Sequence, residues 1–372
     1  MFAIAAFVAS AAAVLYILFG YPLLLQFWPA QRRRAASRDP QTFRTVSVIL
    51  PVKNGERWIR QKLDSLFALD YPQHLLQVIV ISDGSTDRTE EIVREYRDRV
   101  VLLGNPQSGK STAINHALTH ATGEILFMTD VRQPIEPDAL RFLIASFDDP
   151  VVGVASGELI IRKSDSAEEE NVGLYWKYEK WIRKRHSAID SVMGATGAIY
   201  AMRRSLARPL PAGALLDDVQ LPLGAFFQGY RVLFVEEARA YDAPTALEQE
   251  FHRKVRTLAG VYQLFAVYPE LLGPKNRMWL HFFSHKVGRL LLPYLLFVVF
   301  VSSLFLPWPW SVLMVSAQVM FYGVALLDVF IPPSPLKKIS SLAKTFSVLM
   351  WAAFCATSIL FRSSDSLWKP TR

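Results

Sequence analysis

Long apolar stretches without charge lie at both ends of the chain, and they constrain its fold more than any other feature. Residues 2–28 contain no charged side chain, and the runs 290–310 and 311–331 contain only Asp328. A helix of about 20 apolar residues crosses the hydrocarbon core of a bilayer, where each backbone polar group must be paired within the segment. These runs therefore predict three transmembrane helices, and the shorter run 345–361 predicts a fourth crossing.

The first apolar run has the flanks of a retained membrane helix rather than those of a cleaved signal peptide. A signal peptide carries positive charge before a short apolar core. Here the core is long, and the basic cluster Arg32–Arg34 follows it. Because Lys and Arg are enriched on the cytoplasmic side of a membrane, the sequence predicts an N-terminus outside and the following domain in the cytoplasm.

The formal net charge of +8 comes without a long basic tract or a nucleic-acid-binding motif, so nucleic acid is not an expected partner. Positive charge beside apolar runs suits a protein that lies against anionic lipid and binds an anionic substrate. Basic groups in such places are Arg32–Arg34, Arg183–Arg185, Arg253–Arg256 and Lys337–Lys338. The single cysteine, Cys355, lies in an apolar run and is interpreted as a packed small hydrophobic residue.

Three apolar runs in the first half of the chain are each followed by a polar turn, as in an α/β protein with a parallel sheet. The runs are Val46–Pro51, Val78–Ile81 and Val100–Leu103. Continuous apolar runs are typical of strands that are buried on both faces. Ligands bind at the carboxyl ends of such strands in open sheets, so the turns that begin at Pro51 and Ser82 are expected to form one crevice.

The segment from Gly104 to Ser111 satisfies the P-loop pattern G-x-x-x-x-G-K-[ST], between a predicted strand and a predicted helix. A membrane P-loop ATPase is therefore one hypothesis. Such an enzyme also needs a distant acidic strand for Mg²⁺, yet only about 20 residues separate Lys110 from the next strand-ending aspartate, Asp130. The hypothesis also assigns no role to the two earlier strands and their acidic turns.

Taken in order, these segments resemble a family 2 glycosyltransferase with the GT-A fold. The resemblance runs from about Val46 to Gly260, and it rests on Pro51–Glu56, Ser82–Asp87, Gly109–Ser111 with Asn115, and Asp130 after an apolar strand. It implies an α/β fold, a nucleotide-sugar donor and inversion at the anomeric carbon. Carboxylates accept hydrogen bonds from ribose or base groups, and a lysine offsets phosphate charge. The donor-binding residues that the resemblance implies are Pro51, Asn54, Glu56, Asp83, Lys110 and Asp130.

The sequence departs from the family after Asp130. The family's D-x-D motif supplies a second carboxylate for a divalent cation, whereas Asp130-Val131-Arg132 places a guanidinium there. Arg132 cannot ligate a metal. Two alternatives follow: Asp130 binds Mg²⁺ or Mn²⁺ together with water and substrate oxygens, or Arg132 takes over part of the charge neutralisation. We expect a bound metal.

A glycine-containing loop and an acidic pair complete the resemblance. The loop Gly194-Ala195-Thr196-Gly197 resembles the family's acceptor-binding loop, and its glycines permit close approach of another molecule. Asp217 and Asp218 precede an apolar helical pattern, where such residues often serve only to cap the helix. The resemblance assigns Asp218 the role of general base, which takes the proton of the acceptor hydroxyl, with Asp217 as its neighbour.

The segment after this domain is basic and aromatic. Related processive synthases carry Q-x-x-R-W here, and in this chain Arg253 and Thr257 occupy the glutamine and tryptophan positions, while Arg256 matches the arginine. Arg253 and Arg256 are expected to bind the donor's diphosphate. The missing tryptophan favours a single addition, and a processive polysaccharide synthase stays the alternative. His281 and His285 are expected to face lipid headgroups.

The predicted protein is a multi-pass glycosyltransferase of the plasma (inner) membrane with a cytoplasmic catalytic domain. It uses a nucleotide sugar, most simply a UDP-sugar, and a lipid-linked or glycan acceptor. Subunits of an export or assembly system are partners that fit this scheme. The predicted domains are a transmembrane helix at 1–30, the GT-A domain at 45–250, interfacial amphipathic helices at 251–286, transmembrane helices at 287–361 and a tail at 362–372.

Overall fold

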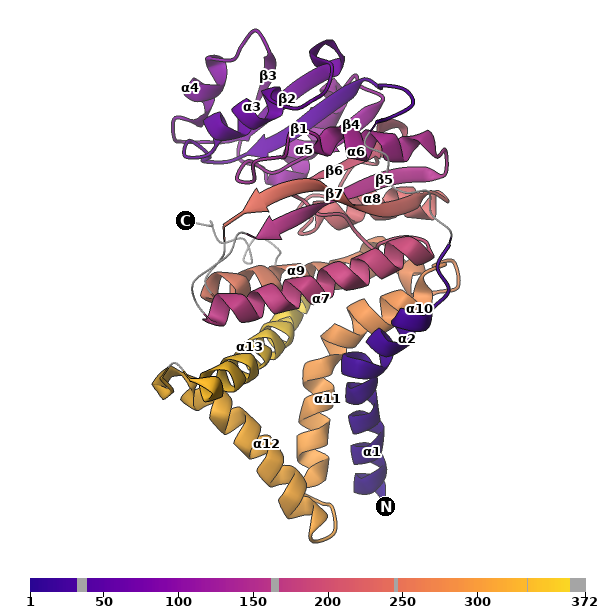
Figure 1. Ribbon diagram of the computed structural model, residues 1–372, viewed down its shortest axis with the longest axis vertical. Helices are drawn as coiled ribbons and strands as arrows, with labels where there is room; N and C mark the ends of the chain where they lie inside the picture. The colour runs from indigo at the N-terminus through magenta and orange to yellow at the C-terminus, as the bar shows by residue number, and fades with distance from the viewer. Residues whose placement is uncertain (32–38, 162–166, 244–246, 333, 362–372) are drawn as a thin grey trace. The chain divides into compact units, whose positions relative to one another are not determined.

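The computed structural model describes residues 1–31, 39–161, 167–243, 247–332 and 334–361 (Figure 1). The chain divides into two compact units. We call them the sheet unit, residues 30–162 and 186–243, and the helical unit, residues 1–29, 163–185 and 244–372. The basic cluster Arg32–Arg34 and the tail 362–372, which the sequence analysis used, lie outside the described residues.

In the part of the chain that the structure describes, the sheet unit contains a mixed sheet of seven strands, and the predicted α/β class is confirmed (Figure 1). The strand order is β3-β2-β1-β4-β6-β5-β7, and β6 is antiparallel to both of its neighbours. The three predicted runs form β1, β2 and β3, whereas no strand was predicted for the segment that forms β6. The strands are β1 Val46–Val52, β2 Leu76–Asp83, β3 Val100–Asn105, β4 Ile125–Met128, β5 Val152–Ile161, β6 Tyr200–Arg203 and β7 Arg231–Asp242.

Helices cover both faces of the parallel part of the sheet, because its strands are apolar on both sides. Helices α3, α4 and α6 share one core with Val46, Val48 and Leu50 of β1. Helix α5 packs against β1 and β2 and buries Ala113 and Ile114. The connection from β3 back to β4 runs through α5 in the opposite direction along the sheet, and the right-handed crossover rule then places α5 on the other face. The helices of this unit include α3 Ile59–Phe67, α4 Thr89–Arg94, α5 Lys110–His120, α6 Ala139–Ala145 and α8 Asp217–Phe227.

The strand order reverses between β1 and β4, and this reversal positions the polar turns. The chain proceeds from β1 outward to β2 and β3 and then returns to β4, on the other side of β1. These four strands are parallel, so the turns that follow them open at one edge of the sheet. In open α/β sheets the ligand crevice lies at such a reversal.

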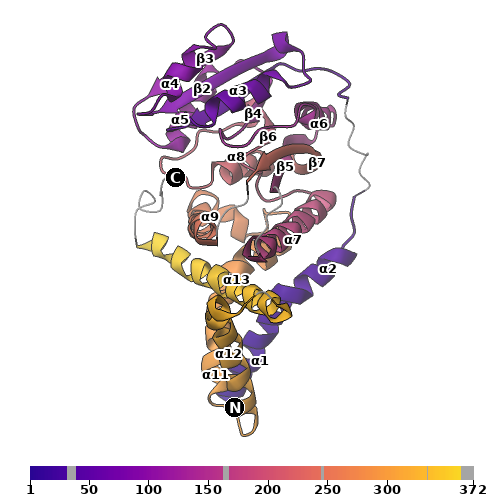
Figure 2. The same cartoon turned by 60° about the vertical axis from the view of Figure 1, so that its left-hand side comes forward.

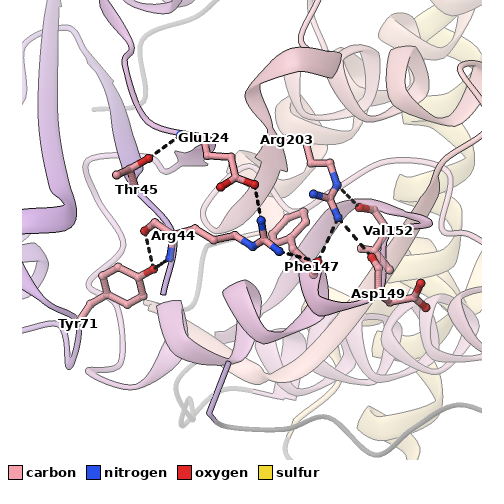
Figure 3. A network of polar contacts seen from close by, with 8 residues as sticks. All are labelled: Arg44, Thr45, Tyr71, Glu124, Phe147, Asp149, Val152 and Arg203. Atoms are coloured by element: carbon pink, nitrogen blue, oxygen red, sulfur yellow. Dashed lines mark hydrogen bonds and ion pairs between the residues drawn. The ribbon is translucent and has the colours of Figure 1, made fainter. Parts of the chain in front are cut away.

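At the opposite edge of the sheet, two arginines fasten the strand ends (Figure 3). Arg44 precedes β1, and its side chain pairs with Glu124. The Tyr71 hydroxyl accepts a hydrogen bond from the backbone N–H of Arg44 at 2.9 Å and donates one to the backbone carbonyl oxygen of Arg44 at 2.7 Å. Arg203 Nε donates to the carbonyl oxygen of Val152 at 2.8 Å. These contacts join segments of the fold to one another, so we interpret this edge as structural.

The helical unit is built from apolar helices together with the long helices α7 and α9. Among the described residues, four stretches are long and apolar enough to cross a membrane: Phe2–Phe27, Trp279–Ser303, Trp310–Phe330 and Pro335–Leu360. Helices α1 and α11 lie side by side, and α12 packs on α13 (Figure 2). The helices are α1 Phe2–Leu15, α2 Tyr21–Phe27, α7 Ala167–Ile189, α9 Leu247–Val267, α10 Trp279–Phe282, α11 Gly288–Ser303, α12 Trp310–Leu327 and α13 Pro335–Ala356.

Two candidate spans begin earlier than the apolar runs suggested. The second begins at Trp279, within the segment predicted to be interfacial, and the fourth begins at Pro335. The prediction that His281 and His285 face headgroups is wrong, because they are only 3% and 5% exposed. Their rings are within hydrogen-bonding distance of a tyrosine hydroxyl and a glutamate of the same unit. The two histidines of the second candidate span therefore point into the helical unit, where they contact polar side chains.

A largely buried carboxylate of α7, Glu179, is the centre of a group of charges that we call the Glu179 cluster. Glu179 pairs with Arg289 of α11 and lies 3.3 Å from His285 Nε2. Burial raises the pKa of Glu179, but the charges of Arg289, His285 and Lys254 more than offset this effect and hold the pKa well below its usual value. The cluster therefore joins α7, α9 and α11, because the negative charge of Glu179 is balanced by positive side chains from the other two helices.

Candidate active site

The turn after β1 is fixed by the turn after β2. Asn54 has a φ of +51°, in the left-handed region that asparagine tolerates better than most residues. Its Oδ1 accepts from the backbone N–H of Thr86 at 2.8 Å. Glu56 Oε2 accepts from the backbone N–H of Arg88 at 3.0 Å. The structure thus brings the predicted donor-binding residues Asn54 and Glu56 to the edge where β1 and β2 end, close to Pro51 in β1.

Asp83 ends β2, and its carboxylate organises the glycine-lysine turn. Its Oδ1 accepts from the backbone N–H of Ser108 at 2.8 Å, and its Oδ2 accepts from that of Gly109 at 3.1 Å. In a P-loop such backbone N–H groups surround phosphate oxygens. Here the buried carboxylate of Asp83 accepts the hydrogen bonds of these N–H groups. The arrangement argues against the ATPase hypothesis, and it ties Asp83, at the end of β2, to the turn that precedes α5.

Lys110, the first residue of α5, lies among carboxylates, and we call this group the Lys110 cluster. Its Nζ is 2.9 Å from Asp130 Oδ1 and 3.1 Å from Asp217 Oδ2. Burial lowers the pKa of Lys110, but the charges of Asp130, Asp217 and Asp218 more than offset this effect and raise the pKa above its usual value. Residues that are far apart in the sequence, after β4 and at the start of α8, thus meet around one lysine.

Asp218 approaches this cluster beside Gly197. A Cβ added to Gly197 would lie 3.2 Å from Asp218 Oδ2 and 3.4 Å from Asp130 Oδ2. Leu216 is the N-cap of α8, so both aspartates stand in its first turn rather than at the cap. The absence of a side chain at Gly197 therefore leaves room next to both carboxylates.

The loop 194–197 is held between α8 and β5. Gly194 has a φ of +125°, and a Cβ there would lie 2.8 Å from a methyl carbon of Val219. The backbone N–H of Ala195 donates to the carbonyl oxygen of Asp218 at 2.7 Å. The backbone N–H of Thr196 donates to Ser156 Oγ at 2.8 Å. The structure thus places the predicted acceptor loop in direct contact with the predicted base.

Tyr200 of β6 was missed as a residue of this site, because its local sequence signal is only the strand preference of aromatic residues. Its side chain is fully buried, and among the described residues its hydroxyl has no hydrogen-bond partner. Burial raises the pKa of Tyr200 well above its usual value, and the charges of Asp217, Asp218 and Asp130 raise it further. Tyr200 therefore supplies a neutral hydroxyl near the three carboxylates.

Two further residues hold the turn that carries Asp130. Arg132 donates from Nη2 to Asp242 Oδ2 at 2.6 Å, so its guanidinium is paired within the sheet unit. Lys62 of α3 is 1% exposed and donates to Thr129 Oγ1 at 2.6 Å. Burial lowers the pKa of Lys62 to about 7, and the charge of Asp130 opposes this shift. Lys62 was missed in the sequence analysis.

The Lys110 cluster suits a divalent cation that is shared with a phosphate ligand. Within the described residues, no three His, Cys, Asp or Glu side chains form a ready metal site. Mg²⁺ and its relatives often take one or two carboxylates and complete their shell with water and substrate phosphates. Asp130 supplies such oxygen ligands, and three carboxylates face one lysine, so the charge balance also favours a cation.

Arg253 and Arg256 belong to α9 of the helical unit. Arg253 pairs with Glu250, and its guanidinium carbon lies 5.0 Å from the centroid of the Trp176 ring. Lys254 lies 5.2 Å from the centroid of the same ring. The contact of Arg253 and Arg256 with the donor's diphosphate stays a prediction.

Two protein-family models match the chain. The model "Glycosyl transferase family 2" matches residues 47–210, and the model "Glycosyl transferase family group 2" matches residues 133–327. The second match covers about half of the chain, and it includes the acidic pair at the start of α8 and the whole of α9.

Curated relatives of the chain have low sequence identity to it. The probable glycosyltransferase YdaM of Bacillus subtilis is 26% identical over 218 residues, which cover 53% of this chain and 50% of that protein. The beta-monoglucosyldiacylglycerol synthase of Nostoc sp. is 26% identical over 252 residues, which cover 63% of this chain and 52% of that protein. The chain thus spans about half the length of these relatives.

One solved structure resembles the chain over nearly its whole length. It is the mannosyltransferase PcManGT from Pyrobaculum calidifontis in complex with GDP-Man and Mn²⁺, with a TM-score of 0.71, 23% sequence identity, and coverage of 96% of this chain and 98% of that chain. The similarity confirms a GT-A-like fold with long apolar helices in its N-terminal and C-terminal regions.

Proposed function

The chain belongs to glycosyltransferase family 2, and we propose that it uses a nucleotide sugar as donor and transfers the sugar, with inversion, to an acceptor at a membrane surface. The donor in this proposal is a UDP-sugar, and the acceptor is a lipid or a lipid-linked glycan. The observation that carries the proposal is the convergence of Lys110, Asp130, Asp217 and Asp218 at the reversal of the strand order.

The donor binds along the turns after β1 to β4 in this proposal. Asn54, Glu56 and Asp83 lie toward the base and ribose, and Lys110 and Asp130 lie toward the diphosphate. A divalent cation held by Asp130 would neutralise phosphate charge and so make the diphosphate a better leaving group. Lys110 moves its charge from the carboxylates to the phosphate oxygens when the donor enters, since an ammonium group on a flexible stem can follow the greater negative charge.

Asp218 acts as the general base. Its carboxylate takes the proton of the acceptor hydroxyl while the hydroxyl oxygen forms a bond to the anomeric carbon. The bond between that carbon and the diphosphate oxygen breaks on the opposite side, and the nucleoside diphosphate leaves with the electron pair. The loop 194–197 positions the acceptor, supported by the hydrogen bond from Ala195 N–H to the Asp218 carbonyl at 2.7 Å.

The four candidate spans in the described residues support an acceptor that is presented at the membrane. A lipid acceptor also agrees with the relative named as a beta-monoglucosyldiacylglycerol synthase. We place the sheet unit at the cytoplasmic face of the plasma membrane, where nucleotide sugars are made. Arg253 and Arg256 are proposed to contact the diphosphate, because guanidinium groups match phosphate oxygens in geometry.

A processive polysaccharide synthase is the second candidate function. It is favoured by Arg256, which matches the arginine of the Q-x-x-R-W motif, and opposed by Thr257 at the tryptophan position. The two functions differ in product. A single-addition enzyme releases an acceptor that is longer by one sugar, whereas a synthase releases a long polymer.

The proposal is tested with purified protein in detergent and a series of UDP- and GDP-sugars, with and without Mn²⁺. A donor that binds the folded state raises the melting temperature, and that donor is then supplied in radiolabelled form with a membrane lipid extract. We expect label in a product that partitions with lipid. Label in a high-molecular-weight polymer would favour the synthase, and transfer that survives exhaustive chelation would contradict the metal assignment.

A further inference from the structure

The turn after β4, residues 129–133, carries Asp130 and is held from two sides by buried ionisable side chains. One is Lys62 of α3, and the other is Asp242 at the end of β7. Neither residue belongs to the donor-binding or catalytic set derived above. Both are nearly inaccessible to solvent, with 1% of Lys62 and 5% of Asp242 exposed.

Lys62 joins the two ends of the turn. Its Nζ donates to Thr129 Oγ1 and to the backbone carbonyl oxygen of Gln133, each at 2.6 Å. A buried carbonyl without a partner destabilises a fold, and a lysine carries several N–H donors on one nitrogen. A single side chain therefore satisfies both groups and sets the width of the turn, with Asp130 between its two contacts.

Asp242 holds the far side of the turn. Its Oδ2 accepts from Arg132 Nη2 at 2.6 Å and from Gln133 Nε2 at 2.8 Å. Its Oδ1 accepts from the backbone N–H of Ala243 at 2.9 Å. Three donors thus converge on one buried carboxylate. Gln133 is shared, because its carbonyl contacts Lys62 and its side chain contacts Asp242.

The same turn is connected to the acceptor side. The Thr129 hydroxyl accepts from Lys62 and donates to the carbonyl oxygen of Ala198 at 2.7 Å. Ala198 directly follows the loop 194–197. Lys62 therefore acts on the donor turn and, through one hydroxyl, on the backbone next to Gly197, where Asp130 and Asp218 come close to each other.

We propose that Lys62 and Asp242 are positioning residues that fix the turn 129–133 and thereby aim the Asp130 carboxylate at the donor's diphosphate and its cation. The proposal rests on the donor-binding role proposed for Asp130. It also explains the departure from D-x-D, since Arg132 holds the turn through Asp242 in this structure. The turn is then oriented by groups behind it instead of by a second carboxylate on the metal.

The test uses Lys62→Met, Asp242→Asn and Asp242→Ala in the full chain, with two matched controls. Leu63→Ala removes a fully buried neighbour of Lys62 on α3, and it leaves in place the Lys62 hydrogen bonds that hold the turn. Asp70→Asn removes a carboxylate that pairs with Arg141 at 2.8 Å elsewhere in the sheet unit. The first readout is hydrogen–deuterium exchange of the backbone amides of residues 129–133. The second is Mn²⁺ affinity in the presence of UDP or GDP, followed through the electron paramagnetic resonance signal of free Mn²⁺.

We expect faster exchange of the turn in all three variants, and a loss of Mn²⁺ affinity of about 10- to 100-fold, as for other groups that orient a metal ligand. Asp242→Asn keeps one acceptor oxygen, so its loss falls between those of the wild type and Asp242→Ala. At saturating Mn²⁺ and donor, kcat changes little because Asp218 is intact. Both controls keep the exchange and the affinity of the wild type.

Unchanged exchange of the turn in Lys62→Met and Asp242→Ala would overturn the proposal, and so would an equal loss of Mn²⁺ affinity in Leu63→Ala, which would trace the effect to general destabilisation. Faster exchange of the turn together with a wild-type affinity for Mn²⁺ would also overturn the proposal, since fixing the turn would then have no effect on cation binding. Failure of the wild type to bind Mn²⁺ with either nucleotide would instead contradict the role of Asp130 in the proposed function. The exchange measurement would still test whether Lys62 and Asp242 fix the turn 129–133.

Discussion

The two units of this protein each contain a cluster of charges, and the clusters have opposite compositions. In the sheet unit, the Lys110 cluster sets one lysine against the carboxylates of Asp130, Asp217 and Asp218. In the helical unit, the Glu179 cluster sets one carboxylate against Arg289, with His285 and Lys254 nearby. The Lys110 cluster therefore carries more negative than positive charge, whereas the single negative charge of the Glu179 cluster is balanced by its neighbours.

The clusters also differ in their contact with solvent. The side chains of Lys110 and Asp130 are 25% and 36% exposed, whereas those of Glu179 and His285 are 12% and 5% exposed. A buried charge must be paired with opposite charge from its neighbours. A charge that is already paired in this way attracts a ligand only weakly. We infer that the Lys110 cluster serves binding and catalysis, and that the Glu179 cluster serves the stability of the helices.

The largest effect is expected from Asp218→Asn. An asparagine keeps the shape of the side chain but cannot take the acceptor's proton, so the transfer rate should fall by about 10²- to 10⁴-fold. Donor affinity, measured by calorimetry, should stay near the wild-type value. The same substitution at the exposed Asp98 is the control. A parallel loss of donor affinity would mean that Asp218 is structural.

Glu179→Gln tests the other side of the comparison. Removal of one partner from a buried ion pair destabilises a protein by about 3–5 kcal/mol, so the melting temperature in detergent should fall clearly. Lys177→Gln, at an exposed position of the same helix, should leave it unchanged. An unaltered melting temperature in Glu179→Gln would mean that the Glu179 cluster is not structural.

The pH dependence of Glu179→Gln has a definite sign. The pKa of Glu179 in the folded state lies well below its usual value of 4.5. Its contribution to stability is therefore present above about pH 4.5 and is lost as the pH falls through the folded-state pKa. The difference in melting temperature between the wild type and Glu179→Gln should shrink as the pH is lowered below this value.

Lys110→Met should have two smaller effects of opposite direction. Donor affinity should fall about 10- to 150-fold, since a hydrogen bond to a charged group contributes about 1.5–3 kcal/mol. Binding of Mn²⁺ without nucleotide should become tighter, because Asp130 and Asp217 lose the cation that now lies 2.9 and 3.1 Å from them. Weaker binding of both ligands would argue that Lys110 only shapes the crevice.

The smallest effect is expected at an ion pair outside both clusters. Glu90 and Arg94 lie 2.7 Å apart on the surface of α4, with side chains 30% and 64% exposed. Solvent screens such pairs, and they contribute little. Glu90→Gln should change neither transfer nor the melting temperature. A clear change would show that location in a cluster is not what gives a charge its importance here.

Much of the sheet unit could be predicted from local pattern. The apolar runs became β1, β2 and β3 because strands buried on both faces need no polar side chains. The local pattern put Asp130 at the end of a predicted strand and Asp217 and Asp218 at the start of a predicted helix, and the family resemblance supplied their expected roles. The apolar runs at both ends likewise became candidate spans, although Trp279 and Pro335 begin two of them earlier than hydropathy alone indicated.

The position of Lys62 in its helix is a local signal of burial. Lys62 lies on the buried face of α3 together with Ile59, Leu63 and Leu66. A lysine at such a position is a signal, since charged residues are rarely buried without a partner. The partner itself, the turn 129–133, lies about 70 positions away in the sequence. No local pattern identifies it.

The amino-acid sequence by itself determined the elements of this protein: buried strands, apolar spanning helices, and the polar turns with their carboxylates. These depend on the periodicity and burial of neighbouring residues. Only the tertiary structure decided the partners of the charges. Arg132 meets Asp242 across 110 positions, and Lys110 lies between Asp130 and Asp217. Such pairings follow from the order of strands in the sheet, because a charge near the core must find compensation wherever the fold brings an opposite charge or a dipole within reach.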